Sequence, residues 1–328
     1  MWLILILLAY FFLAQANFLD KYILGGSLPS PKIYSFFVGL LSLTTLFIVP
    51  TGILLSLYVF SPLQVIFPEA FDVLYIPELP LVLLGISAGF SFLFGLYFYY
   101  KAVFSFEVSR VGPAVGGLVP LFTLFLIYIF SFLPLETGLQ KGVFTVKQFA
   151  AFIFLVSGSV ILSVHKKSRI TFKSLKVSII ASFLFSLSFL LTKLVYIFLP
   201  FWTGLIWVKM GSFVAASCFL LSPEVKEGLR KKRKSFAKKV ALPFLLAKGA
   251  GSLGSVLQNG AIFLAPVAFL PFINALAGVQ YVFLIIIATL FCFKFPRVLK
   301  EEISKKALAQ KIIAILLIAI GLSLFALF

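Results

Sequence analysis

The chain has 328 residues, of which 62% are hydrophobic and 12% are charged, and its mean hydropathy is +1.16. Soluble globular domains are about half apolar and about a quarter charged, so this composition excludes a soluble protein. Because about 20 consecutive apolar residues cross a bilayer, the apolar content is enough for about ten membrane-spanning helices.

A membrane β-barrel is also excluded, because its strands alternate apolar and polar side chains, whereas residues 80–100 and 312–328 show no such alternation. In a soluble protein the net charge of +18 would indicate nucleic-acid binding. Here the basic residues lie between the apolar segments, where they set the orientation of membrane helices. We therefore expect an all-α, multi-pass protein of the cell membrane that contacts the lipid bilayer and binds no nucleic acid.

Ten apolar segments bounded by charged residues, Pro and Gly predict ten transmembrane helices. In chain order they lie at residues 2–19, 32–50, 80–101, 111–131, 146–164, 175–197, 201–221, 241–263, 267–290 and 311–328. Residues 51–79 are apolar but are interrupted by Pro and acidic residues. This stretch predicts an extension of the second helix followed by an interfacial loop.

The two halves of the chain resemble each other in collinear order. Residues 11–21 match residues 183–193 at an offset of 172, Gly95 matches Gly254 at an offset of 159, and Gly158 matches Gly321 at an offset of 163. Each half, 1–165 and 166–328, then holds five predicted helices. Because five is odd, the second half enters the bilayer from the opposite side, and we expect two inverted five-helix repeats.

The basic residues are distributed unevenly among the connections. Those after the first, third, fifth, seventh and ninth predicted helices carry 23 Lys and Arg, and the other four connections carry 2. Cytoplasmic connections of membrane proteins are enriched in Lys and Arg. The charges therefore predict that these five connections are cytoplasmic and that both termini face outward.

Several segments resemble the drug/metabolite transporter superfamily, and specifically its EamA-like members. The resemblance is carried by Asn17-Phe-Leu-Asp-Lys21, by Tyr100-Lys-Ala-Val-Phe104 with residues 107–120, by residues 136–148, and by Gly158 and Gly321. It implies one EamA-like repeat in each half and transport, often export, of a small metabolite through a central cavity lined by helices 1, 3, 4, 6, 8 and 9. It also implies cytoplasmic termini, which differs from the orientation that the charges predict.

Three lysines, Lys193, Lys209 and Lys248, lie inside predicted helices, where a charge is costly unless it faces protein or water. Lys209 is the deepest, because it lies about 12 Å and 18 Å from the two helix ends at ~1.5 Å per residue. Lys193 lies close to a helix end, where its stem can extend to the interface. Lys209 and Lys248 are therefore candidate binding residues.

The predicted helices contain no Asp or Glu in their interiors, since Asp20 and Glu107 fall at helix ends or in connections. We therefore expect Lys209 and Lys248 to have no carboxylate partner within the protein. An anion that reached such an amine would form a charge-assisted hydrogen bond. The expected solute thus carries a carboxylate or a phosphate, as an amino acid or organic acid does.

The eighth predicted helix carries a polar stripe, because its polar and small residues recur at steps of three and four. The stripe comprises Lys248, Gly251, Ser252, Ser255, Gln258 and Asn259. Small polar residues also mediate ordinary helix packing in membranes, so the stripe indicates either a wet cavity or a packed interface. Further candidates for the cavity wall are Asn17, Ser182, Ser186, Asn274 and Tyr281.

Features of an enzyme are nearly absent. The single histidine, His165, lies in a basic connection, and no Gly-x-x-x-x-Gly-Lys-Ser/Thr loop occurs. Cys218 and Cys292 form no metal-binding pattern, and no metal or other cofactor is expected. We expect a secondary transporter that moves a small organic metabolite by alternating access. A flippase for a lipid-linked precursor and a membrane scaffold protein stay open as alternatives, and so does the oligomeric state, a homodimer included.

Overall fold

The computed structural model describes residues 1–26, 30–58, 74–105, 108–132, 145–163, 172–230, 234–294 and 305–326. Within these ranges the chain is helical and has no strand. The α-helices are α1 (Trp2–Gly26), α2 (Pro31–Leu41), α3 (Thr45–Tyr58), α4 (Leu79–Ser105), α5 (Val108–Phe130), α6 (Val146–Ser163), α7 (Phe172–Phe198), α8 (Phe201–Phe219), α9 (Pro223–Arg230), α10 (Lys234–Leu264), α11 (Leu270–Ala275), α12 (Ala277–Lys294) and α13 (Lys305–Ala326). Two short 3-10 helices are η1 (Ser42–Thr44) and η4 (Val267–Phe269). Glu107, His165 and residues 136–144 lie outside the described residues.

Among the described residues, five helical segments are long and apolar enough to cross a membrane. They are Trp2–Asp20, Pro31–Ile53, Leu79–Phe104, Lys176–Phe198 and Val267–Leu284. Helices α8 and α9 add a sixth if they are counted as one span, although the chain bends by 88° between them. Several helices of this length and composition indicate an integral membrane protein, and the total of ten spans stays a prediction.

Each of the ten predicted segments is helical over most of its length, but several boundaries differ. Helix α1 continues beyond the predicted end at residue 19 to Gly26, because the carboxylate of Asp20 finds partners inside the protein. The second predicted helix continues through η1 and α3 to Tyr58, as the apolar sequence after residue 50 suggested. The ninth is interrupted at Leu276, and Pro271 stands in the first turn of α11, where its missing N–H is not needed.

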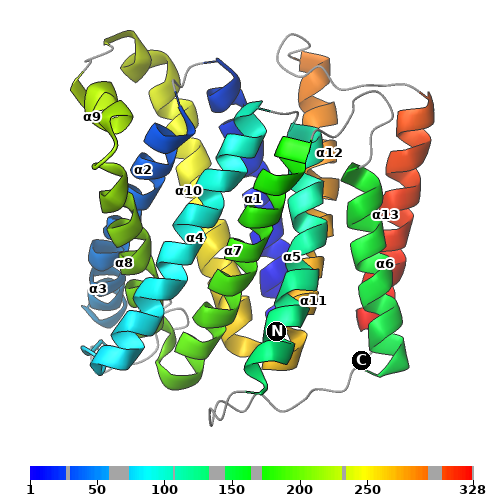
Figure 1. Ribbon diagram of the computed structural model, residues 1–328, viewed down its shortest axis with the longest axis horizontal. Coiled ribbons are helices and arrows are strands. Elements are labelled where there is room, and N and C mark those ends of the chain that lie inside the picture. The colour runs from blue at the N-terminus through cyan, green and yellow to red at the C-terminus, as the bar shows by residue number, and fades with distance from the viewer. Residues whose placement is uncertain are drawn as a thin grey trace.

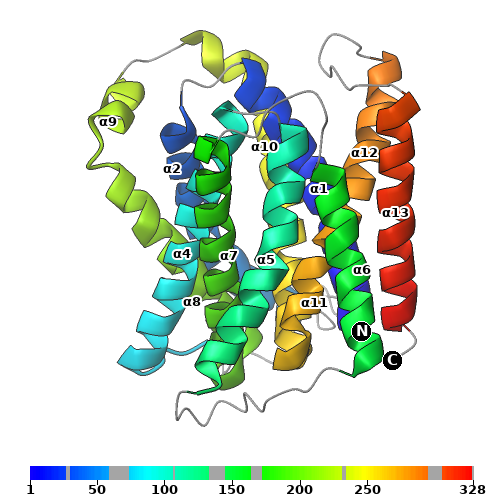
Figure 2. The ribbon, with the colours of Figure 1, turned by 45° about the vertical axis from the view of Figure 1, so that its right-hand side comes forward.

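The two halves of the chain interleave in the bundle (Figures 1 and 2). Helix α1 packs along α10, and α4 packs along both α7 and α8. Helices α6 and α13 pair at one edge of the bundle, while α2, α3 and α8 lie at the other edge (Figure 1). Four of these pairs join a helix from residues 1–165 to a helix from residues 166–328. They are α1 with α10, α4 with α7, α4 with α8, and α6 with α13.

Glycines permit the closest of these contacts. A Cβ atom on Gly211 of α8 would overlap the carbonyl group of Ile86 on α4. Between α6 and α13, a Cβ on Gly158 would lie 2.9 Å from the carbonyl oxygen of Ala314, and Gly321 is equally confined against α6. Small residues let membrane helices approach closely, so Gly158 and Gly321 act as packing residues in this bundle.

The start of α1 and the end of α13 lie at the same end of the bundle, and α9 lies at the opposite end (Figures 1 and 2). This arrangement is what an even number of spans requires. Helix α9 belongs to the strongly basic connection after α8, and the sequence analysis predicted no helix there. Its Glu224 forms an ion pair of 3.3 Å with Lys32 in the first turn of α2.

Candidate functional site

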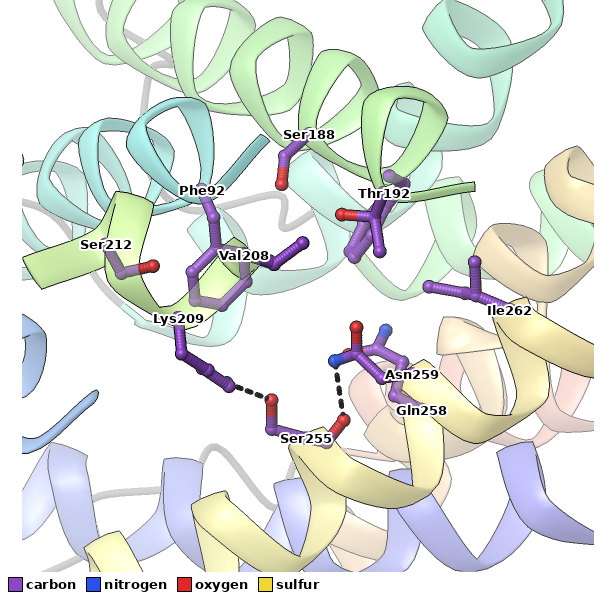
Figure 3. Close-up of a pocket in the computed structure, with 11 residues that line it drawn as sticks. Phe92, Ser188, Thr192, Val208, Lys209, Ser212, Ser255, Gln258, Asn259 and Ile262 are labelled. Atoms are coloured by element: carbon purple, nitrogen blue, oxygen red, sulfur yellow. Dashed lines mark hydrogen bonds between the residues drawn. The ribbon is translucent and has the colours of Figure 1, made fainter. Parts of the chain in front are cut away.

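A polar cavity lies inside the bundle between α4, α7, α8 and α10 (Figure 3). Its lining comprises Phe92, Ser188, Phe189, Thr192, Val208, Lys209, Ser212, Ser255, Gln258, Asn259 and Ile262. Its volume is about 20 Å³, which is enough for a single ordered water and too small for a metabolite. The side chains that line the cavity therefore leave no room for a metabolite in this conformation.

Lys209 supplies the positive charge of the cavity. Its ammonium group donates a hydrogen bond of 2.7 Å to the hydroxyl of Ser255, which joins α8 to α10. The same nitrogen lies 5.9 Å from the centre of the Phe92 ring, within the range of a cation–π contact. Among the described residues no carboxylate lies within ion-pair distance of Lys209.

The polar stripe on α10 divides between two environments. The structure places Ser255, Gln258 and Asn259 at the cavity. The side-chain amide of Asn259 donates to the carbonyl oxygen of Ser255 at 2.8 Å (Figure 3). The amide oxygen of Asn259 accepts a hydrogen bond of 2.9 Å from the hydroxyl of Tyr196. Ser252 is exposed on the outer surface of the helix and does not line the cavity.

The glycines of this helix do not face the cavity. A Cβ on Gly254 would lie 2.8 Å from the side chain of Leu13, and a Cβ on Gly251 would contact Ala16. Both neighbours belong to α1, along which α10 packs. The sequence left open whether the stripe lines a wet cavity or packs against another helix. Both occur, on different sides of α10.

Lys248 lies in a second polar cluster, and here the sequence analysis was wrong. Its ammonium group forms an ion pair with the carboxylate of Asp20, at 3.0 Å and 3.1 Å from the two oxygens. The carboxylate also accepts hydrogen bonds from the hydroxyls of Tyr34 and Tyr100. We expected no carboxylate partner because Asp20 was placed after the end of the first helix, but α1 continues past it and faces α10.

This Asp20 cluster joins four helices and is shielded from solvent. The side chains of Asp20 and Lys248 are 9% and 15% exposed. The ammonium group lies 4.5 Å from the centre of the Tyr34 ring, which adds a cation–π contact. The cluster links α1, α2 and α4 of the first half to α10 of the second.

Lys193 has a third kind of environment. Its ammonium group donates hydrogen bonds of 3.0 Å to the carbonyl oxygens of Ile262 and Phe263, in the last turn of α10. Carbonyl groups there have no partner within their own helix, and the helix dipole favours a positive charge at that end. Lys193 therefore caps α10 instead of extending to the membrane surface.

The remaining candidates from the sequence lie outside the cavity wall. Ser182 and Ser186 are fully buried, and their hydroxyls donate to carbonyl oxygens of α5 and of their own helix α7. Asn274 donates to Thr123 at 2.8 Å, and the ring of Tyr281 packs against Gly116. Asn17 is half-buried on α1. These residues fix the packing of α5, α7, α11 and α12.

Seven cavity residues were not anticipated from the sequence: Phe92, Ser188, Phe189, Thr192, Val208, Ser212 and Ile262. Ser188 and Thr192 are four residues apart on α7, so the helical spacing that revealed the stripe on α10 was present here too. The neighbouring series Ser178, Ser182 and Ser186 has the same spacing and drew the prediction to the wrong face. Phe92 carries no signal, because it is one of 42 phenylalanines.

Comparisons with known proteins show the fold and no more. No family model and no curated protein matches the sequence. One solved crystal structure, described only as that of a protein, superimposes with a TM-score of 0.60 over 99% of this chain and 96% of its own length, at 15% sequence identity. A solved structure therefore has a similar fold along nearly the whole chain.

Proposed function

We propose that this protein is a secondary transporter of the drug/metabolite superfamily that moves a small organic solute across the membrane through the Lys209 cavity. The observation that carries the proposal is this cavity, in which a partly buried ammonium group lies with amide and hydroxyl groups between apolar helices from both halves of the chain. Ionisable side chains inside membrane helices are costly and mark solute or ion pathways. Binding sites between the repeats of a transporter have this composition.

The order of helix packing supports an inverted repeat. The first helix of each half packs along the third helix of the other half, as α1 does with α10 and α4 with α7. The last helices of the two halves, α6 and α13, pack with each other. A two-fold exchange of the halves converts the pair α1 with α10 into the pair α7 with α4 and maps the pair α6 with α13 onto itself, as expected for inverted repeats.

The small volume of the cavity supports transport by alternating access. A metabolite fits only if the helices around the cavity separate, and the bond from Lys209 to Ser255 holds two of them, α8 and α10, together. An enclosed site that opens on one side at a time carries solute without forming a continuous pore. In this proposal the structure represents a state in which the cavity has no room for the solute.

The test is solute flux into proteoliposomes that contain the purified protein, measured with a panel of amino acids, organic acids and sugar phosphates. We expect uptake of at least one solute, and we expect Lys209→Met to abolish it. The matched control is Lys101→Met, because Lys101 is an exposed lysine on α4. Translocation of a labelled lipid without flux of a soluble solute would indicate a flippase, and the absence of both activities would indicate a scaffold protein.

A further inference from the structure

We propose that the cavity selects solutes by a carboxylate or phosphate group, which the ammonium of Lys209 binds in place of the Ser255 hydroxyl. This inference rests on the proposed transport function and adds the chemical class of the substrate. It follows from comparing the hydrogen-bond partners of Lys193, Lys209 and Lys248, the three lysines that the sequence places deep inside predicted membrane helices.

Two of the three lysines have acceptors that suit a buried cation. Lys248 has both oxygens of the Asp20 carboxylate, and Lys193 has two carbonyl oxygens at the end of a helix, where the dipole adds a negative partial charge. A Lys ammonium group carries three N–H donors. In both positions at least two acceptors surround it, so neither lysine needs a ligand.

Lys209 is the exception. Its ammonium group donates to one neutral hydroxyl, that of Ser255, and its other contact is a phenylalanine ring at the outer limit of a cation–π interaction. Lys209 lies about 12 Å from the nearer end of α8, which is farther than its stem can extend along the helix. An anion in the cavity would supply the acceptors and the countercharge that this ammonium group lacks within the described residues.

The carboxylate of Asp20 in α1 does not neutralise Lys209. Asp20 already accepts hydrogen bonds from Lys248, Tyr34 and Tyr100, and none of these residues lines the cavity. The described cavity wall therefore holds one positive and no negative charge. This balance favours an anionic ligand and disfavours a cationic one.

The other polar groups of the cavity complement an anion. The hydroxyls of Ser188 and Thr192 on α7 point into the same space as the Lys209 ammonium (Figure 3). Hydroxyl groups are donors as well as acceptors, so they can share the oxygens of a carboxylate or phosphate with Lys209. The amides of Gln258 and Asn259 lie on the opposite wall, where they suit the polar remainder of an organic solute.

The experiment measures thermal unfolding of the full chain in detergent with four probes: butyrate, butanol, butylamine and inorganic phosphate. The three butyl compounds have similar length and differ in charge. A ligand that binds the folded state raises the unfolding temperature, and at equal concentration a tighter ligand raises it more. We expect butyrate or phosphate to raise it, and butanol and butylamine to leave it unchanged.

Variants at Lys209 connect this selectivity to the proposed site. Lys209→Met should reduce the apparent affinity for the anion by about tenfold or more, since a hydrogen bond to a charged group is lost, and Lys209→Arg should retain the anion preference. Lys101→Met should bind like the wild type. Stabilisation by butylamine alone, by neither anion, or equally in Lys209→Met would overturn the proposal. Flux of a neutral or cationic solute would overturn the anion preference while leaving the transport function intact.

Discussion

Breaking the buried ion pair between Asp20 and Lys248 should destabilise the protein far more than breaking a surface pair. In Lys248→Met the carboxylate of Asp20 keeps two tyrosine hydroxyls but loses its countercharge. Removing one partner of a buried pair costs about 3–5 kcal/mol, because the remaining charge stays uncompensated. The cation–π contact with Tyr34 is lost as well, which adds about 0.5–2 kcal/mol.

The chain offers a matched control in the ion pair of Lys32 with Glu224. Its N···O distance of 3.3 Å is similar, but its side chains are 37% and 45% exposed. Exposed pairs contribute about 0–1 kcal/mol, so Lys32→Met should have little effect. The assay is equilibrium unfolding in mixed detergent micelles, followed by circular dichroism for the wild type and both variants.

A double variant separates the charge from the packing of the lysine stem. Asp20→Asn together with Lys248→Met removes both charges of the pair, so that neither position keeps an unpaired ion. Adding the effects of the two single variants gives an expected free energy of unfolding for the double variant. The measured value should exceed this sum by at least about 2 kcal/mol. Equal stabilities of Lys248→Met and Lys32→Met, or strictly additive effects in the double variant, would refute the reasoning.

Three further predictions concern orientation and packing. A reporter that is active only in the cytoplasm should be silent when fused to the C-terminus, because the basic connections predict outward termini, and strong activity would reverse the orientation. Gly211→Leu should prevent assembly of the folded protein, because the leucine side chain would overlap the backbone at Ile86. Gly249→Ala is the control and should be tolerated, since no atom lies within 4 Å of a Cβ at this position. Size-exclusion profiles of the two variants distinguish these outcomes. Lys193→Met should lower the free energy of unfolding by about 1.5–3 kcal/mol, because two carbonyl groups at the end of α10 lose a charged donor. Unchanged stability would show that this cap does not stabilise the protein.

The sequence predicted the helices well because their existence depends on local composition. A run of about 20 apolar residues is helical in a membrane whatever it packs against, since its backbone groups must be satisfied within the segment. The ends of α1 and the break at Leu276 depend on contacts with other helices and were missed. The extension of α1 past Asp20 is stabilised by Lys248, which lies 228 residues later in the chain.

Part of the candidate site was also predictable from local sequence, because some of its residues lie on one helix. Periodicity within α10 pointed to Ser255, Gln258 and Asn259, because residues three and four apart share one face of a helix. It could not show that Lys209 on α8 would meet Ser255, since that contact depends on how the two helices cross. Nor could it distinguish the serines of α7 that pack against α5 from Ser188, which lies at the cavity.

The central claim, that the Lys209 cavity opens alternately to the two sides of the membrane, is tested most directly by labelling Ser255→Cys in a variant without the native cysteines. A membrane-impermeant thiol reagent is applied separately to each side of sealed vesicles. The control is Leu253→Cys, because Leu253 lies on the outer surface of the same helix and is 56% exposed. We predict that the cysteine at position 255 is labelled from both sides and the control from neither. Labelling at position 255 from one side only, or from neither, would contradict alternating access through this cavity.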